Sequence, residues 1–341
     1  MVGEMSKLLK AAKIVVIGGG TGTYSVLSGL KEYTRNITAV VSMTDSGGSA
    51  KKERDEWGLL PSSDIRKSLI ALADVSKQNI LLLRRLFQYR YNQGEGVTGM
   101  TFGNLFLVAL TDLLGSQEKA IKKAGVILRI KGRVLPVTLD KVNLLARYTD
   151  GTTIIGEHFI DEPDHDGKLA ITSLETRPKA MINPAVKEAI LQSDIIIIGP
   201  GGFYTTIIAN LVVKGVVDTI RKSQAKKIFI LNLMTEYGQT FKFSASKFIL
   251  ELNKYFPTEH LDYVLMNNAP LPAKILKYYK EFQAEAVIDD FPTDTPFRVI
   301  RSDLLSNKVV RKEKGDKLKR SLLRHDSQKI AELCINVLGL I

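Results

Sequence analysis

Short apolar runs rich in Ile and Val alternate with amphipathic stretches along most of this chain. The run at 13–19, KIVVIGG, has the composition of a strand buried on both faces, and it ends in glycine. The same pattern predicts strands at 13–19, 37–43, 194–199, 227–233 and 263–267, and helices at 23–33, 64–73, 81–91, 102–114, 184–192, 205–214 and 326–338. This alternation predicts an α/β fold with a doubly wound, mostly parallel sheet.

The pattern changes in the middle of the chain. Segments at 126–138, 144–150 and 152–160 have the composition of short strands separated by Gly and Asp turns, and a polar loop follows at 161–168. We therefore expect a β-rich insertion at 130–180 that covers one edge of the main sheet. Otherwise we expect one domain over 1–341, with a basic segment and a C-terminal helix at 300–341.

Composition narrows the class of protein. The chain is 45% hydrophobic and 25% charged, which is typical of a globular protein. Because no apolar run approaches the ~18–20 residues that span a bilayer, we expect no membrane insertion. We read no signal peptide at the start, and the single cysteine, Cys334, fits a reducing compartment, so we expect a cytoplasmic protein.

The net charge of +12 raises the question of a nucleic-acid partner. Much of the excess lies in residues 308–324, KVVRKEKGDKLKRSLLR, where no aromatic residue is interleaved to stack on bases. A generally basic surface is therefore favoured over a nucleic-acid site. If the charge did mark such a site, binding to DNA or RNA would fall steeply with salt.

Three predicted strands end in glycine-rich loops. Loop 1 is residues 18–23 (GGGTGT), loop 2 is residues 45–49 (DSGGS) and loop 3 is residues 199–202 (GPGG). Loop 1 lacks both the G-x-G-x-x-G spacing and the P-loop lysine, so alone it is either a phosphate loop or a tight turn. Three such loops at the carboxyl edge of a parallel sheet favour a site for a nucleotide's phosphates.

Several polar residues at this edge have more than one reading. Asp45 either binds a ribose hydroxyl, holds Mg²⁺ beside a diphosphate, or caps its own turn. Asp64 is expected to be the N-cap of helix 64–73, with Arg66 either paired to it or forked onto phosphate. Asn232 and Asn267 end two predicted strands at the same edge, and Thr205 begins the helix after loop 3.

Long stretches over nearly the whole chain resemble the YvcK/CofD-like family. They are IGGGTGT, TDSGGSAKKERDEWGLLPSSDIRKSLIALADV, FQYRYNQGEGVTGMTFGNL, KGRVLPVT, GPGGFYTTIIANLVVKG, NLMTEYGQT, DYVLMNN and RHDSQKI. The resemblance implies a Rossmann-like core with a ligand site at the switch edge. The YvcK branch of the family binds nucleotide sugars such as UDP-N-acetylglucosamine and is linked to carbon metabolism and cell-wall morphogenesis. The CofD branch transfers 2-phospholactate from a guanosine diphosphate donor to a deazaflavin precursor with Mg²⁺.

The resemblance also implies which residues meet the ligand, by position. These are Gly19, Gly20, Thr21, Gly22, Thr23, Asp45, Ser46, Gly47, Arg66, Asn104, Gly199, Gly201, Gly202, Thr205, Asn232, Asn267, Tyr279 and Arg324, with Asp45 also the candidate for a metal. The chain departs from the family pattern at Ser46, where the family often has a second Asp, and at Met100, where it has a His.

The spacing is closer to the YvcK branch, so the leading hypothesis is a regulatory protein that binds a nucleotide sugar without catalysis. Protein partners in cell-wall synthesis and a homo-oligomer would accompany that role. The alternative is a phospholactyl transferase in which Asp45 holds Mg²⁺ on a diphosphate. Loss of the second acid at Ser46 weighs against the transferase.

Overall fold

The computed structural model describes residues 10–75, 77–307 and 322–337. Seven strands form one sheet in the order β10-β9-β8-β7-β1-β2-β3, and every neighbouring pair is parallel. The strands are β1 (Ile14–Gly18), β2 (Ile37–Val41), β3 (Arg133–Pro136), β7 (Ile195–Ile198), β8 (Lys226–Ile230), β9 (Tyr263–Asn267) and β10 (Arg298–Ser302). The predicted α/β fold with a parallel sheet is confirmed.

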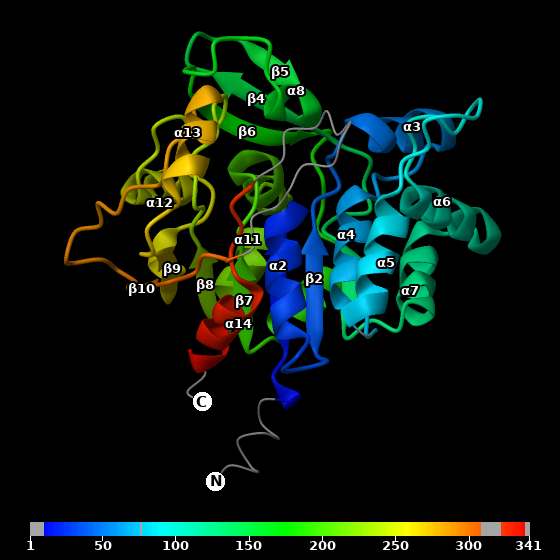
Figure 1. The fold of residues 1–341 in the computed structure, drawn as a ribbon, viewed down its shortest axis with the longest axis horizontal. Helices are drawn as coiled ribbons and strands as arrows, with labels where there is room; N and C mark the ends of the chain where they lie inside the picture. The colour runs from blue at the N-terminus through cyan, green and yellow to red at the C-terminus, as the bar shows by residue number, and fades with distance from the viewer. Residues whose placement is uncertain (1–9, 76, 308–321, 338–341) are drawn as a thin grey trace.

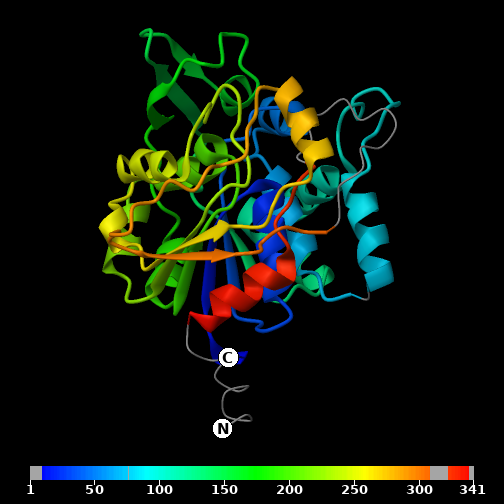
Figure 2. The same ribbon diagram turned by 60° about the vertical axis from the view of Figure 1, so that its left-hand side comes forward.

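Helices lie on both faces of this sheet (Figures 1 and 2), as a doubly wound fold requires. The α-helices are α2 (Gly20–Leu30), α3 (Gly48–Trp57), α4 (Ser63–Leu72), α5 (Lys77–Gln88), α6 (Phe102–Leu114), α7 (Gln117–Ile127), α8 (Glu157–Asp161), α9 (Pro184–Leu191), α10 (Ala209–Leu211), α11 (Val216–Lys222), α12 (Ala245–Asn253), α13 (Ala273–Glu281) and α14 (Ser327–Asn336). Two other turns are the π-helical η1 (Phe203–Ile208) and the 3₁₀ turn η2 (Thr258–His260). In the described residues no helix combines the length and apolarity needed to cross a bilayer.

The centre of the sheet is the point where the winding reverses. From β1 the chain adds β2 and β3 on one side, and from β7 it adds β8, β9 and β10 on the other. All four residues of β7 and all five of β1 are buried, because helices cover both faces. Loops 1, 2 and 3 therefore leave three adjacent strands at the switch point, where ligands bind in such folds.

A second, antiparallel sheet lies over this edge (Figure 1). Its order is β5-β4-β6, formed by β4 (Asn143–Tyr148), β5 (Thr153–Ile155) and β6 (Ile171–Arg177). The expected insertion starts later than residue 130, because β3 pairs with β2 and is the edge strand of the main sheet.

Two of the short strands predicted in this region are partly helical. The prediction of a strand at 152–160 is wrong after Ile155, because Gly156 has φ 110° and the chain then turns into α8. The expected strand at 126–138 is also wrong at its start, since Val126 and Ile127 end α7.

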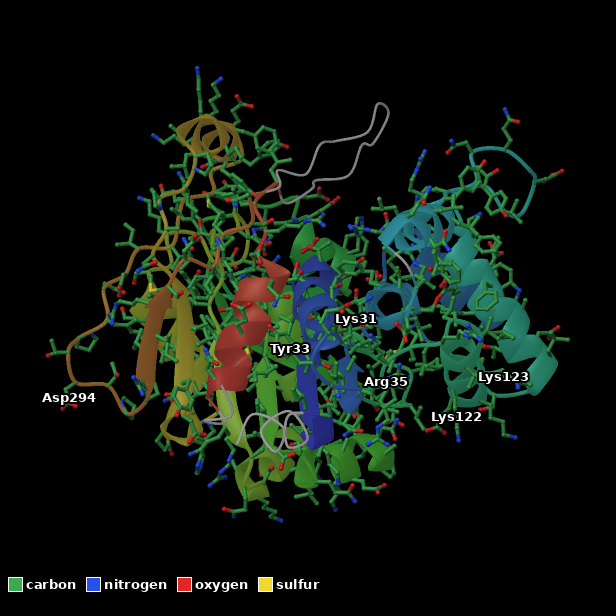
Figure 3. All side chains as sticks on the ribbon, turned by 60° about the horizontal axis from the view of Figure 1, so that its bottom comes forward. Lys31, Tyr33, Arg35, Lys122, Lys123 and Asp294 are labelled. Atoms are coloured by element: carbon green, nitrogen blue, oxygen red, sulfur yellow. The ribbon has the colours of Figure 1, made fainter. Side chains whose placement is uncertain are left out.

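Cationic side chains lie at the end of the sheet opposite the loops, where the parallel strands begin. Figure 3 shows Lys31, Tyr33 and Arg35 at the end of α2, on the side facing away from the loops. Lys31 donates to the carbonyl of Ala73 at 2.8 Å, and Arg35 pairs with Asp74 at 3.1 Å. Part of the positive charge thus serves contacts between elements. Most of the predicted basic segment, residues 308–321, lies outside the described residues.

Candidate functional site

Loops 1 and 3 pack against each other backbone to backbone. A Cβ on Gly22 would collide with the main chain of Pro200, and one on Gly201 would collide with the Thr206 hydroxyl and approach the carbonyl of Gly19. Gly22 is therefore required by the packing of loop 1 on loop 3, and Gly201 by the packing of loop 3 on Thr206, whereas the sequence pattern predicted a ligand at both. Gly20, with φ 67°, is different: a Cβ there would meet nothing within 4 Å.

The start of α2 is capped by a carboxylate from another helix. The amide of Gly20 donates to Asp64 Oδ1 at 3.0 Å, and Lys67 Nζ forms an ion pair with the same oxygen at 2.9 Å. A negative charge is favourable there because the amide groups at a helix N-terminus carry partial positive charge. The prediction that Asp64 caps its own helix is wrong: Ser62 is at the N-cap of α4, and Asp64 lies inside the first turn.

Loop 2 is held by a hydrogen bond within the loop and by another to α8. Asp45 Oδ1 accepts from the amide of Gly47 at 3.0 Å, which is the turn-capping role among the three readings of this residue. Ser46 Oγ accepts from the amide of His158 at 3.1 Å, so the first turn of α8 rests on the loop. Position 46, where the family often has an acid, thus joins the insertion to the main sheet.

Carboxylates gather beside these loops. Burial raises the pKa of Asp45, and the charge of Asp64 raises it further, while Lys67 opposes the rise. Burial also raises the pKa of Glu157 well above its usual value, with Asp45, Asp161 and Asp64 adding to the effect. Several acids therefore lie close together where a phosphate is expected, and burial disfavours the ionised forms of Asp45 and Glu157.

Among the described residues, no three or more His, Cys, Asp or Glu side chains lie together so that they could hold a metal ion. Asp45 has one oxygen engaged with Gly47, and the nearby Asp64 is engaged with Gly20 and Lys67. This donor set fits only a Mg²⁺ ion that shares one or two carboxylates with ligand phosphates. Mg²⁺ at Asp45 stays a prediction.

A pocket opens beside loop 3, at the ends of β8 and β9. Its volume is about 230 Å³. The lining combines amide and apolar side chains: Asn232, Leu233, Met266, Asn267, Asn268, Ala269, Leu271, Leu276, Ala286 and Val287. Asn232 Nδ2 donates to the carbonyl of Gly201 at 2.8 Å, while its Oδ1 is buried without a hydrogen-bond partner. The two strand-end asparagines therefore share one pocket, next to loop 3.

Asn267 also fixes the wall of this pocket. Its Nδ2 donates to Ala269 O at 2.8 Å, and its Oδ1 accepts from the amide of Leu304 at 3.0 Å. Behind the wall, Tyr279 is buried and its hydroxyl accepts from the amides of Leu322 and Leu323 at 2.9 and 3.2 Å. Tyr279 thus anchors the C-terminal segment that carries Arg324.

Three expected ligand residues are buried behind the loops. Arg66 is 7% exposed and donates from Nη1 to Phe87 O at 2.7 Å, rather than pairing with Asp64. Asn104 is fully buried. Burial raises the pKa of the neighbouring Glu53 to about 7, and hydrogen bonds from the amide and hydroxyl of Ser62 oppose the rise. The hydroxyl of Thr205, which is 3% exposed, lies against Gly202. In this conformation these residues support the loops from within.

Two residues of the candidate site are not predicted by the sequence pattern. Lys67 pairs with Asp64, and Glu157 lies near Asp45 of loop 2 and near Asp64 and Asp161. The spacing of Asp64 and Lys67, three residues apart in a predicted helix, was a usable signal for the first. No local signal places Glu157 there, since it arrives from the insertion.

Comparison with known proteins gives consistent results. The model of a family described as "2-phospho-L-lactate transferase CofD" matches residues 14–305. The "Gluconeogenesis factor" of Bacillus subtilis is 34% identical over 326 residues, covering 96% of this chain and 98% of that protein. The "Gluconeogenesis factor" of Halalkalibacterium halodurans is 33% identical over 325 residues, covering 95% and 96%.

A solved structure has the same fold over almost the full length. A crystal structure of a Bacillus halodurans protein of the UPF0052 family superposes with a TM-score of 0.83 at 30% identity, covering 95% of this chain and 98% of that one. The family match, the relatives and the fold agree with the order of the loop motifs. The chain therefore belongs to the YvcK/CofD-like family, among relatives named gluconeogenesis factors.

Proposed function

We propose that this chain binds a nucleotide sugar of the UDP-N-acetylglucosamine type along the loop edge of the sheet. The diphosphate lies at loop 1, in front of Gly20, and the uracil or sugar occupies the pocket of Asn232 and Asn267. The observation that carries the proposal is Asn232, which holds loop 3 through Nδ2 and leaves a buried Oδ1 without a partner beside the pocket. Buried polar atoms without partners are rare, and a ligand N–H would satisfy this one.

The role that we propose for the bound state is regulatory rather than catalytic, in the cytoplasm. The relatives' name connects those proteins with gluconeogenesis. On the family resemblance, we extend this to carbon metabolism and cell-wall morphogenesis, with protein partners that respond to the bound sugar. The acids at the loop edge are engaged in capping and ion pairs, which is consistent with a binding protein.

Titration calorimetry with UDP-N-acetylglucosamine tests the proposal. We expect binding to the wild-type protein and an affinity about tenfold lower for Asn232→Ala, since one good hydrogen bond in a desolvated pocket contributes about 1–2 kcal/mol. Glu175→Gln, at an exposed ion pair with Arg147 on the small sheet, is the control and should bind normally. A folded protein that gives no heat at millimolar ligand would contradict the proposal.

The family's transferase chemistry is the second candidate. It is favoured by the description of the matching family and by the proximity of Asp45 and Asp64, two carboxylates that a Mg²⁺–diphosphate can share. Mass spectrometry of a mixture of protein, Mg²⁺, a guanosine-diphospho-lactate donor and a deazaflavin acceptor decides. A phospholactylated product supports the transferase, and an unchanged acceptor eliminates it.

A further inference from the structure

Lys67 lies between the first two loops, although it belongs to neither. It is paired with Asp64, the carboxylate that caps loop 1, at 2.9 Å, and its charge lowers the pKa of Asp45 in loop 2. Its side chain is 31% exposed, whereas that of Asp64 is 11% exposed. Lys67 is therefore a cation beside both loops that solvent, and hence a ligand, can reach.

Asp64 occupies the position that an anionic ligand would take on loop 1. Its Oδ1 accepts the amide of Gly20, the glycine of the loop that has open space before it. Its Oδ2 lies where a Cβ on Gly19 would be, so the carboxylate sits directly against the loop. At the base of the same loop, the fully buried hydroxyl of Thr23 is turned toward Gly18 and has no hydrogen-bond partner.

The local charge balance makes this arrangement costly for a second anion. The charge of Asp64 raises the pKa of Asp45, and the charges of Asp45 and Asp64 both raise the pKa of Glu157, so these acids lie close together. A phosphate added at Gly20 with Asp64 in place would meet the charge of Asp64 and compete with it for one amide. A phosphate that displaces Asp64 would gain both the Gly20 amide and the ammonium of Lys67.

We propose that Asp64 holds the phosphate position of loop 1 in the free protein, and that Lys67 passes from Asp64 to the ligand's phosphate on binding. The inference rests on the proposed function, because it assumes that the phosphates lie at loop 1. It adds a binding residue and an internal competitor to that site. Ligand affinity then depends on how much more strongly the start of α2 binds the ligand's phosphate than it binds the Asp64 carboxylate.

Three variants separate the two roles. Asp64→Asn keeps an oxygen for the Gly20 amide but removes the competing charge, so affinity should rise about three- to tenfold. Lys67→Gln removes the cation and should lower affinity at least tenfold, while Lys67→Arg should restore most of it. Lys226→Gln breaks a comparable exposed ion pair, with Asp262, at the amino end of β8 and should bind as the wild type does.

The probes are inorganic pyrophosphate and UDP-N-acetylglucosamine, measured by calorimetry on full-length protein, with circular dichroism to confirm folding. If Asp64→Asn weakens binding, Asp64 is a ligand contact and the inference is overturned. Unchanged affinity in Lys67→Gln overturns the role of Lys67. If pyrophosphate follows the predicted order while the nucleotide sugar does not bind, the inference stands and the proposed function fails. Wild-type protein that binds neither probe overturns both.

Discussion

The two halves of the loop edge are built in opposite ways. At the ends of β7, β1 and β2 the chain fills its own site, with glycine backbones in contact and the Asp64 carboxylate capping α2. At the ends of β8 and β9 it leaves a pocket of about 230 Å³ lined by amides and apolar groups. The first half presents charged side chains and backbone amides to a ligand, and the second presents a cavity into which part of a ligand can fit.

The difference shows that glycine density and open space are separate features. A side chain at Gly22 would collide with loop 3 and one at Gly201 with Thr206, whereas of the glycines in loops 1, 2 and 3 only Gly20 has nothing within 4 Å of an added Cβ. A cavity instead appears where the loops are bounded by asparagines and leucines. A ligand that fits both halves carries an anionic part and a compact, hydrogen-bonding part, as a nucleotide sugar does.

The largest effect should come from filling the contact between loops 1 and 3. Gly22→Ala places a methyl group against the main chain of Pro200, which cannot rotate away, so we expect a loss of about 3 kcal/mol in the free energy of unfolding. Gly20→Ala meets no atom and should lose about 1–2 kcal/mol, from its positive φ alone. Urea unfolding measures both, and equal losses would show that the loops do not support each other.

The two halves should also respond to pH in opposite directions. Burial raises the pKa of Glu53, behind loop 2, to about 7, and lowers the pKa of His325, near the end of β8, to about 4. The folded state therefore holds the Glu53 proton more tightly, so this contribution to stability is lost as pH rises from about 4.5 to 7. The His325 contribution is present above pH 6.5 and is lost as pH falls toward 4.

Each shift corresponds to at most about 3 kcal/mol. Urea unfolding at a series of pH values should show Glu53→Gln removing the loss of stability as pH rises from about 4.5 to 7, and His325→Gln removing the loss as pH falls from 6.5 toward 4. A Glu53→Gln profile parallel to the wild type would mean that this carboxyl titrates normally in the folded protein.

The smallest effect is expected from a substitution that changes only the shape of the pocket at the ends of β8 and β9. Ala269→Leu projects extra methyl groups into the pocket from its rim, so it should lower the affinity for UDP-N-acetylglucosamine about tenfold. Stability should stay within about 1 kcal/mol, since Ala269 is only partly buried. Pyrophosphate, which needs only the loop half, should bind as it does to the wild type. Parallel loss of both ligands would show that the halves are not separable.

Much of the sheet could be predicted because each buried strand is itself a continuous apolar run. The all-apolar runs of β1 and β7 are buried on both faces, and their observed bounds differ from the prediction by one residue at each end. The adjacency of loops 1, 2 and 3 follows from the winding. By contrast, α3 was missed because GSAKKERDEW has almost no apolar face: it is anchored by the buried Ser49, Ala50 and Glu53. The amphipathic α12 and α13 were also passed over.

The sequence could predict which loops and strand ends meet at this edge of the sheet, but not the contacts among them. The asparagines at 232 and 267 were correctly placed at one edge, because parallel strands end together. That Asp64 caps α2 instead of α4 depends on how two helices pack, and no local pattern records it. The burial of Arg66 beneath α6 depends on tertiary packing in the same way.

The contact between Gly22 and Pro200 has a consequence for how the protein is made. The two residues lie far apart in the chain, and β7 completes the centre of the sheet only after β2, β3 and the whole small sheet have been synthesised. A nascent chain that ends before residue 195 lacks loop 3 and Asn232, so it has neither the contact between loops 1 and 3 nor the pocket. Because contacts of such long sequence separation form late, ligand binding would report that translation and folding of the sheet are complete.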